Sequence, residues 1–143
     1  MKTFKWYTIL VGVVILIFTA CAPKAVTPSV SIPQDIEDVS QPIVENILKS
    51  LALNDFATFS RDFSPEMKKA MTEASFSKMQ ESFAKTLGTF QSVTFDKAES
   101  SQGYIATLFK ATYEKSVITV RVVLSADLPH LVTGLWFPDF PVK

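Results

Sequence analysis

The sequence predicts an α+β domain in which N-terminal helices pack on one face of a four-stranded antiparallel sheet. Before Gly88 the apolar residues recur with a helical period of about 3.6, and after it they alternate with a period of about two. The expected strands are joined by links too short for a crossover, which requires antiparallel pairing. The 143 residues limit the chain to one such domain.

The first expected helix begins with Ser40 as its N-cap and has Pro42 in its first turn. Its apolar stripe consists of Ile43, Val44, Ile47, Leu48 and Leu51. A second, short helix opens at Asn54 or Asp55, because phenylalanines then recur at helical spacing. These phenylalanines are Phe56, Phe59 and Phe63.

A third helix is expected to start at Ser64-Pro65-Glu66, which supplies a cap, a proline at the first helical position and an acid in the first turn. The period slips near residues 72–75, and a fourth helix follows that ends at Gly88. Its apolar face consists of Phe76, Met79, Phe83 and Leu87.

Four strands are expected after Gly88, at residues 90–97, 104–114, 117–125 and 131–137. The alternation predicts which side chains point toward the helices. They are Val93 and Phe95, then Ile105, Phe109, Ala111 and Tyr113, then Ile118, Val120, Val122 and Leu124. Turns are expected at residues 100–103, at Lys115-Ser116 and around Asp127, Pro129 and His130.

The N-terminus has the three parts of a secretory signal peptide. Lys2 and Lys5 provide positive charge, and an unbroken apolar run follows over residues 9–18. The small residues Thr19 and Ala20 then precede Cys21, the one cysteine of the chain. Phe18-Thr19-Ala20-Cys21 resembles the bacterial lipobox, although leucine is usual where Phe18 stands. This resemblance implies that Cys21 becomes the first mature residue and carries lipid, because a cysteine thiolate is a suitable nucleophile for a diacylglyceryl group.

The sequence therefore predicts a lipoprotein signal peptide at 1–20, a lipidated proline-rich tether at 21–41 and a domain at 42–143. Several acyl chains, such as palmitate, give stable anchoring in a membrane. We expect the extracytoplasmic face, and the outer membrane in an organism that has one, since Ala22 supplies no aspartate after the cysteine. The alternatives are an uncleaved anchor, a free thiol or an intermolecular disulfide, and a tether that packs as an edge strand.

Charge excludes one class of partner. Lys2 and Lys5 leave with the signal, so the mature chain carries two more acidic than basic residues. The absence of a basic patch argues against nucleic-acid binding. The mature domain has no further cysteine with which to form an internal disulfide, so an ordinary apolar core must stabilise it.

The segments NDFATFSRDFSPEMKKAM, GTF at Gly88 and TGLWF at 133–137 are similar to the DUF3887 family, a domain of unknown function found in bacterial and archaeal lipoproteins. The resemblance covers about residues 43 to 138. It implies an NTF2-like cone, in which helices cover a curved antiparallel sheet. The family supplies no catalytic residues to carry over.

The residues themselves provide no recognisable catalytic constellation. The inward faces offer only Thr107, Tyr113 and Thr133 as polar groups, whereas an acid–base site needs an interior carboxylate. His130 has Asp127 as a neighbour, but both lie in an expected turn. One histidine and no available thiol are too few for zinc, and no glycine-rich phosphate loop occurs, so we expect no metal or cofactor.

Four residues are candidates for a ligand or partner surface: Tyr113, Arg121, Trp136 and Phe137. Arg121 lies on the outward face and can form an anion-binding pair with Lys110, or be part of a solvated face. Trp136, Phe137 and Phe140 either leave apolar surface exposed to a partner or close the core. The phenylalanines either pack as that core or line a pocket.

Two functions from different classes follow. The first is a non-catalytic accessory module that binds an envelope protein, a cell-wall component or a small apolar ligand, with the tether raising its local concentration. The second is a small pocket enzyme that acts on an apolar small molecule through Tyr113 and one acid. A filled core favours the first, and a cavity with a buried carboxyl of raised pKa favours the second.

Overall fold

The computed structural model describes residues 31–140. The predicted signal peptide (1–20), the predicted lipid-attachment residue Cys21 and residues 22–30 of the expected tether lie outside the described residues. Within residues 31–140, no helix is both long enough and apolar enough to cross a lipid bilayer.

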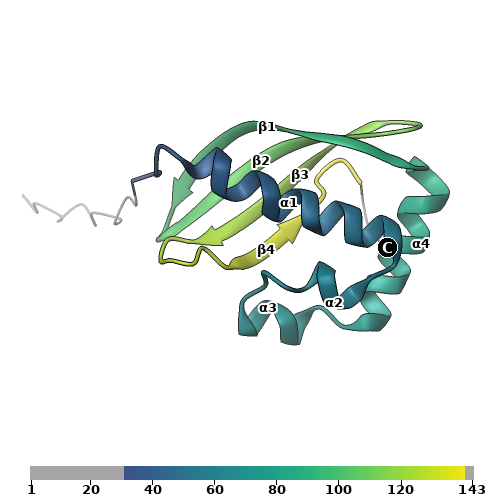
Figure 1. Cartoon of the computed structure of the whole chain (residues 1–143), viewed down its shortest axis with the longest axis horizontal. Coiled ribbons are helices and arrows are strands. Elements are labelled where there is room, and N and C mark those ends of the chain that lie inside the picture. Colours follow the sequence, from purple (N-terminus) through teal and green to yellow (C-terminus); the bar gives the residue numbers. More distant parts are fainter. Residues whose placement is uncertain (1–30, 141–143) are drawn as a thin grey trace, which may run out of the picture.

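Helices occupy the first half of the domain and strands the second (Figure 1). The helices are α1 (Ile36–Leu53), α2 (Phe56–Phe59), α3 (Pro65–Ala70) and α4 (Glu73–Leu87). The strands are β1 (Phe90–Ser101), β2 (Tyr104–Tyr113), β3 (Val117–Ser125) and β4 (Val132–Trp136). They form one antiparallel sheet in the order β1-β2-β3-β4, and α1 runs along one of its faces. The predicted α+β architecture is confirmed.

The first helix begins earlier than the sequence predicted. Ser40 is not its N-cap but lies inside α1, fully buried, and its hydroxyl donates to the carbonyl of Glu37 at 3.4 Å. Ile36, Ser40 and Val44 continue the buried stripe toward the N-terminus. Pro42 removes one helical hydrogen bond, and the carbonyl that loses its donor belongs to Asp38, whose residue is exposed to water. Residues 36–41, which the sequence assigned to the tether, therefore belong to α1.

Helices α2 and α3 begin at the residues that the sequence indicated, and α4 begins within residues 72–75, where the helical period slips. Side-chain oxygens of Asp55, Ser64 and Thr72 accept hydrogen bonds from backbone N–H groups three residues on, at 3.0, 3.2 and 3.2 Å. Hydrogen bonds from Thr58 lower the pKa of Asp55. Gly88 ends α4 with a φ of +77°, a backbone conformation that disfavours side chains.

The first strand is longer than predicted and leads into a tight hairpin. β1 continues past Lys97 to Ser101, and the turn is formed by Gln102 and Gly103 alone. Both have positive φ, at 51° and 83°, as a type I′ turn requires. The register of β1 against β2 shifts between Phe90 and Ser92 and again between Phe95 and Lys97. These two bulges explain why strict alternation could not follow the strand to its end.

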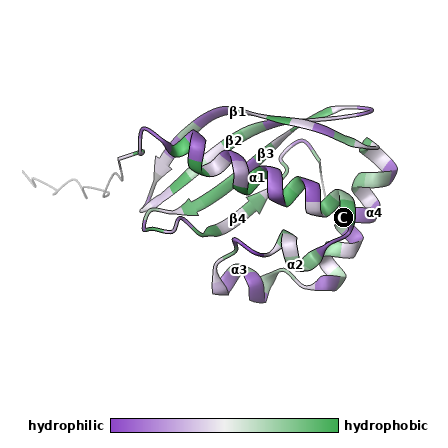
Figure 2. Cartoon of the chain, in the orientation of Figure 1, coloured by the Kyte–Doolittle hydropathy of each residue, from purple (hydrophilic) through white to green (hydrophobic). Residues whose placement is uncertain are grey.

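The core lies between α1 and the sheet face that the alternation predicted. Phe109, Val120 and Val122 contribute fully buried side chains from the strands, and Ile47 and Leu48 do so from α1. In Figure 2, green and purple bands alternate along α1, as expected of an amphipathic helix.

The aromatic residues of the helices pack on one another within this core. The ring of Phe59 lies 5.1 Å from that of Phe63 and 4.8 Å from that of Phe76. All three are buried members of the core cluster. Most of the phenylalanine set that the sequence left open therefore fills the core, and Phe83 is the member that also borders a cavity described below.

Ile36→Ala tests whether the first turn of α1 belongs to the folded domain. Ile36 is buried, so its truncation is expected to lower the free energy of unfolding by about 2 kcal/mol or more. Urea unfolding followed by circular dichroism measures the change. Glu37→Ala is the matched control, because Glu37 is exposed in the same turn and its loss should cost less than about 0.5 kcal/mol. Equal stability of the two variants would show that residues 36–41 belong to the tether and not to the folded domain.

Candidate functional site

One candidate site lies on the sheet face that points away from α1. Register and alternation place Tyr104 and Ala106 of β2, Arg121 and Val123 of β3 and Trp136 of β4 on this outer face. Within the described chain no helix packs on it. Gln102 and Thr133 complete the lining of a shallow groove of about 310 Å³, which we call the outer groove.

Arg121 and Trp136 are direct cross-strand neighbours in this groove. The guanidinium carbon of Arg121 lies 5.4 Å from the centre of the Trp136 ring, a cation–π distance. Arg121 is half-buried and forms no ion pair with residues 31–140. The hydrogen bond and charge of Lys97, and more weakly the charge of Arg121, lower the pKa of the exposed Glu99 nearby. The two candidates from the sequence thus form one unit.

Gly134 allows the indole of Trp136 to lie flat on the sheet. A Cβ atom at Gly134 would be 2.1 Å from Cη2 of Trp136, closer than any real contact. Next to it, the register between β3 and β4 shifts, and the Thr133 hydroxyl donates to the Val123 carbonyl at 3.1 Å. Thr133 therefore lies in the outer groove, and its expected place on the inward face is wrong because this irregularity breaks the alternation.

Tyr104 faces Trp136 across the groove. The two residues are 48% and 49% exposed, which is unusual for large aromatic side chains. A second hollow, of about 410 Å³, shares Gln102, Tyr104 and Thr133 with the outer groove and continues toward Asp127 and Glu66. The sequence analysis missed Tyr104 and Gln102. The sequence did contain a sign of Tyr104: it is an aromatic residue at a position of the strand where the alternation predicts a polar side chain.

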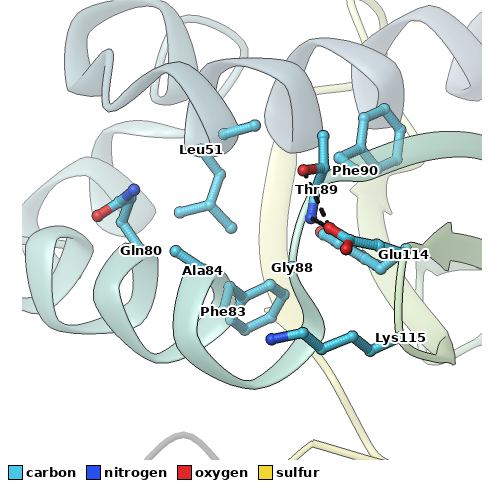
Figure 3. Close-up of a pocket in the computed structure, with 11 residues that line it drawn as sticks. Leu51, Gln80, Phe83, Ala84, Gly88, Thr89, Phe90, Glu114 and Lys115 are labelled. Carbon is cyan, nitrogen blue, oxygen red and sulfur yellow. Dashed lines mark hydrogen bonds between the residues drawn. The ribbon is translucent and has the colours of Figure 1, made fainter.

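Tyr113 lies elsewhere, at a separate cavity on the helix side of the sheet. This cavity, of about 380 Å³, lies between the end of α1, the end of α4 and the adjoining ends of β1 and β2 (Figure 3). The Tyr113 ring packs on Phe83 and Phe90, with ring centres 5.9 and 5.5 Å away. Its hydroxyl is buried without a hydrogen-bond partner among the described residues, and burial raises the pKa of this phenol above its ordinary value. We call this cavity the Tyr113 pocket.

A carboxylate lies at the rim of the Tyr113 pocket. Oε2 of Glu114 accepts from the backbone N–H and from the hydroxyl of Thr89, both at 3.3 Å, as the dashed lines in Figure 3 show. Glu114 is exposed. Lys115, also at the rim, donates from Nζ to the carbonyl of Lys85 at 3.3 Å. Glu114, the acid next to Tyr113, is therefore exposed to water and hydrogen-bonded to Thr89, and it is not buried.

The chain end closes the core beside the last strand. Phe137 is buried, and its ring and that of Phe140 lie 4.8 and 4.6 Å from the ring of Phe83. The carboxylate of Asp139 accepts from the backbone N–H of Thr119 at 2.9 Å, and hydrogen bonds from Thr119 lower the pKa of Asp139. Phe137 thus belongs to the core, while its neighbour Trp136 is on the outer face.

The remaining candidates are engaged locally. Lys110 donates to the Thr119 hydroxyl at 2.8 Å and lies two register positions away from Arg121, on the same face. His130 is buried in the turn before β4, where Nδ1 lies 2.9 Å from the carbonyl oxygen of Ser125. Its backbone N–H, rather than its ring, contacts Asp127. Thr107 is buried and donates to the Val122 carbonyl at 3.2 Å.

Among residues 31–140, no aspartate or glutamate is fully buried, and no three potential metal ligands converge. The outer groove and the Tyr113 pocket offer different chemistry: the outer groove presents a cation and two aromatic surfaces, and the Tyr113 pocket presents aromatic rings, with the Tyr113 hydroxyl itself buried away from solvent.

The family described as "Protein of unknown function (DUF3887)" matches residues 44–128, which span α1 to the turn after β3. No curated protein and no solved structure matches the chain significantly. The family match covers more than half of the chain and confirms the resemblance seen in the sequence over residues 44–128, while the TGLWF segment at 133–137 lies outside it. The protein belongs to the DUF3887 family.

Proposed function

We propose that this protein is a lipid-anchored, non-catalytic binding module at the extracytoplasmic face of a cell membrane. In this proposal, lipid on Cys21 holds the chain at the membrane, residues 22–35 form the tether, and the domain binds an envelope component. The charged start, the apolar run and the small residues before Cys21 support the anchor. An anchored module encounters membrane-bound partners at a raised effective concentration.

The observation that carries the binding role is the outer groove. Arg121 has no ion-pair partner within residues 31–140, and Trp136 leaves half its surface exposed. Arginine and tryptophan are the residues that most often dominate binding energy at interfaces. The solvated face of an antiparallel sheet is usually polar, and the half-exposed Tyr104 and Trp136 depart from that pattern.

The chemistry of the titratable groups supports a role without catalysis. The carboxylates whose pKa values depart from ordinary ones are all lowered, for example those of Glu45 and Asp55, so they are stabilised as anions. A general acid or base at neutral pH needs a shift in the opposite direction. Tyr113 is shifted upward by burial, which keeps the phenol protonated as a hydrogen-bond donor.

We also propose that the fold is of the NTF2-like class. The order of elements and the two bulges in β1 are consistent with a sheet that curves around α1. The Tyr113 pocket, on the helix side of the sheet, is in the position that an interior ligand site of such a cone would take.

A small pocket enzyme that acts on an apolar molecule is the second candidate. The Tyr113 pocket itself favours it, because the rings of Tyr113, Phe83 and Phe90 offer an apolar molecule a surface on which to pack. Glu114 is the acid within the same pocket. Its exposure makes it a weaker base candidate than a desolvated carboxylate.

Cys21→Ser tests the anchor. We expect the wild-type chain to be trimmed before residue 21 and to fractionate with membranes, and the serine variant to be neither trimmed there nor acylated, because serine lacks the thiolate that the acyl transfer needs. Mass spectrometry of the mature chain and membrane fractionation measure both properties. Identical length and acylation of the two chains would contradict the proposal, and retention of the unprocessed serine variant would indicate an uncleaved anchor.

Tyr113→Phe tests whether the phenol has a partner in the free protein. Removal of an unsatisfied buried hydroxyl should leave the free energy of unfolding unchanged or raise it by up to about 1 kcal/mol. Thr107→Val is the control, since it deletes a hydroxyl that is bonded to Val122 and should lower stability by about 1 kcal/mol. A comparable loss in the phenylalanine variant would show that the pocket already contains a partner for Tyr113.

A further inference from the structure

We propose that the outer groove binds carboxylated sugar residues of a polysaccharide. This inference rests on the proposed function and names its ligand class. It assigns separate tasks to the two ends of the groove: Arg121 receives the carboxylate, and the aromatic surfaces of Trp136 and Tyr104 receive the sugar rings.

The guanidinium of Arg121 is held ready for a carboxylate. Its position over the Trp136 ring limits the rotamers of a long side chain before any ligand arrives. Within residues 31–140 it has neither an ion pair nor a side-chain hydrogen bond, so its fork of donors is available. Arginine binds a carboxylate through two parallel hydrogen bonds, which adds geometric selectivity to the charge.

The aromatic spacing fits a ring between the two exposed side chains. The Trp136 indole lies over Gly134 on β4, and Tyr104 lies on β2, two strands away and two residues further along the strand, so about 12 Å separate the two positions. Ala106 and Val123 form a low floor between them. The C–H faces of a pyranose pack on such apolar and aromatic surfaces, while its hydroxyls point outward to groups such as Gln102 and Thr133.

The shape and charge of the site favour a polymer with isolated single charges. The groove is open and continues into the second hollow, which leaves room for a chain to pass beyond one ring. Glu66 and Asp127 line that second hollow and would repel a dense polyanion such as a nucleic acid. The other cations of this face are engaged, Lys97 by Glu99 and Lys110 by Thr119. Within residues 31–140, Arg121 is the one cation that lines the outer groove, so one carboxylate can be matched there.

The experiment uses the full lipidated chain in detergent and oligomers of galacturonate and of glucuronate as probes. Each oligomer is compared with its methyl ester, which keeps the ring but removes the charge. Calorimetric titration should show that at least one acidic oligomer binds and that its ester binds at least about tenfold more weakly. Binding should also weaken with added salt. If neither acid binds more tightly than its ester, the proposal is wrong.

Three variants separate the two ends of the groove. Arg121→Gln should weaken binding of the acidic oligomer at least about tenfold and leave the weak binding of the ester unchanged. Gly134→Ala forces the Trp136 indole off the sheet and should weaken both ligands. Tyr104→Ala should also weaken both. Lys110→Gln is the control for charge on the same face and should change binding less than about twofold, because Lys110 is already bonded to Thr119.

The result distinguishes this inference from the proposed function. A chain that is acylated at Cys21 but binds acid and ester equally contradicts the sugar inference alone. Selective binding of the acid by a chain that is not acylated contradicts the anchor alone. If Lys110→Gln and Arg121→Gln weaken binding of the acidic oligomer equally, the binding depends on general surface charge, and the role assigned to Arg121 is wrong.

Discussion

The packing of one sheet face against α1 is the constraint on which the rest of the molecule depends. Strands alternate their side chains, so burial of Phe109, Val120 and Val122 on one side places their neighbours on the other. A shift of one residue in the register would exchange the two sets and bury the charge of Arg121. The outer groove is therefore a consequence of the core, since the residues that cannot enter the core are the ones available to a ligand.

At the β4 edge of the sheet, short local contacts take the place of another strand. The backbone of Val132 bonds with Asp62 and Ser64, which covers the start of β4. Beyond the end of β4, Asp139 takes up the N–H of Thr119 that would otherwise be unpaired. Together with Phe137 and Phe140, this carboxylate fixes the chain end against α4. These contacts keep the edge from pairing with other chains and set the position of Trp136.

The two cavities differ in what they need from a ligand. The Tyr113 pocket is formed by apolar packing, so it favours a compact apolar molecule. The outer groove is formed mainly by partly exposed side chains beside the buried Ala106, and its proposed selectivity depends on one guanidinium and two aromatic surfaces. They lie on opposite faces of the sheet, so occupation of one does not block the other.

The sequence by itself determined the class of fold, the four strands, the N-caps of α2 and α3 and the end of α4 at Gly88, because these depend on local periodicity and on residues within one turn. It also indicated Arg121 and Trp136 as outward or exposed candidates. Only the tertiary structure decided that they form one unit, that Phe137 belongs to the core and that α1 begins at Ile36. The reason is physical: cross-strand register, the irregularity at Thr133 and the burial of Ile36 each depend on residues distant in the chain, which no local pattern encodes.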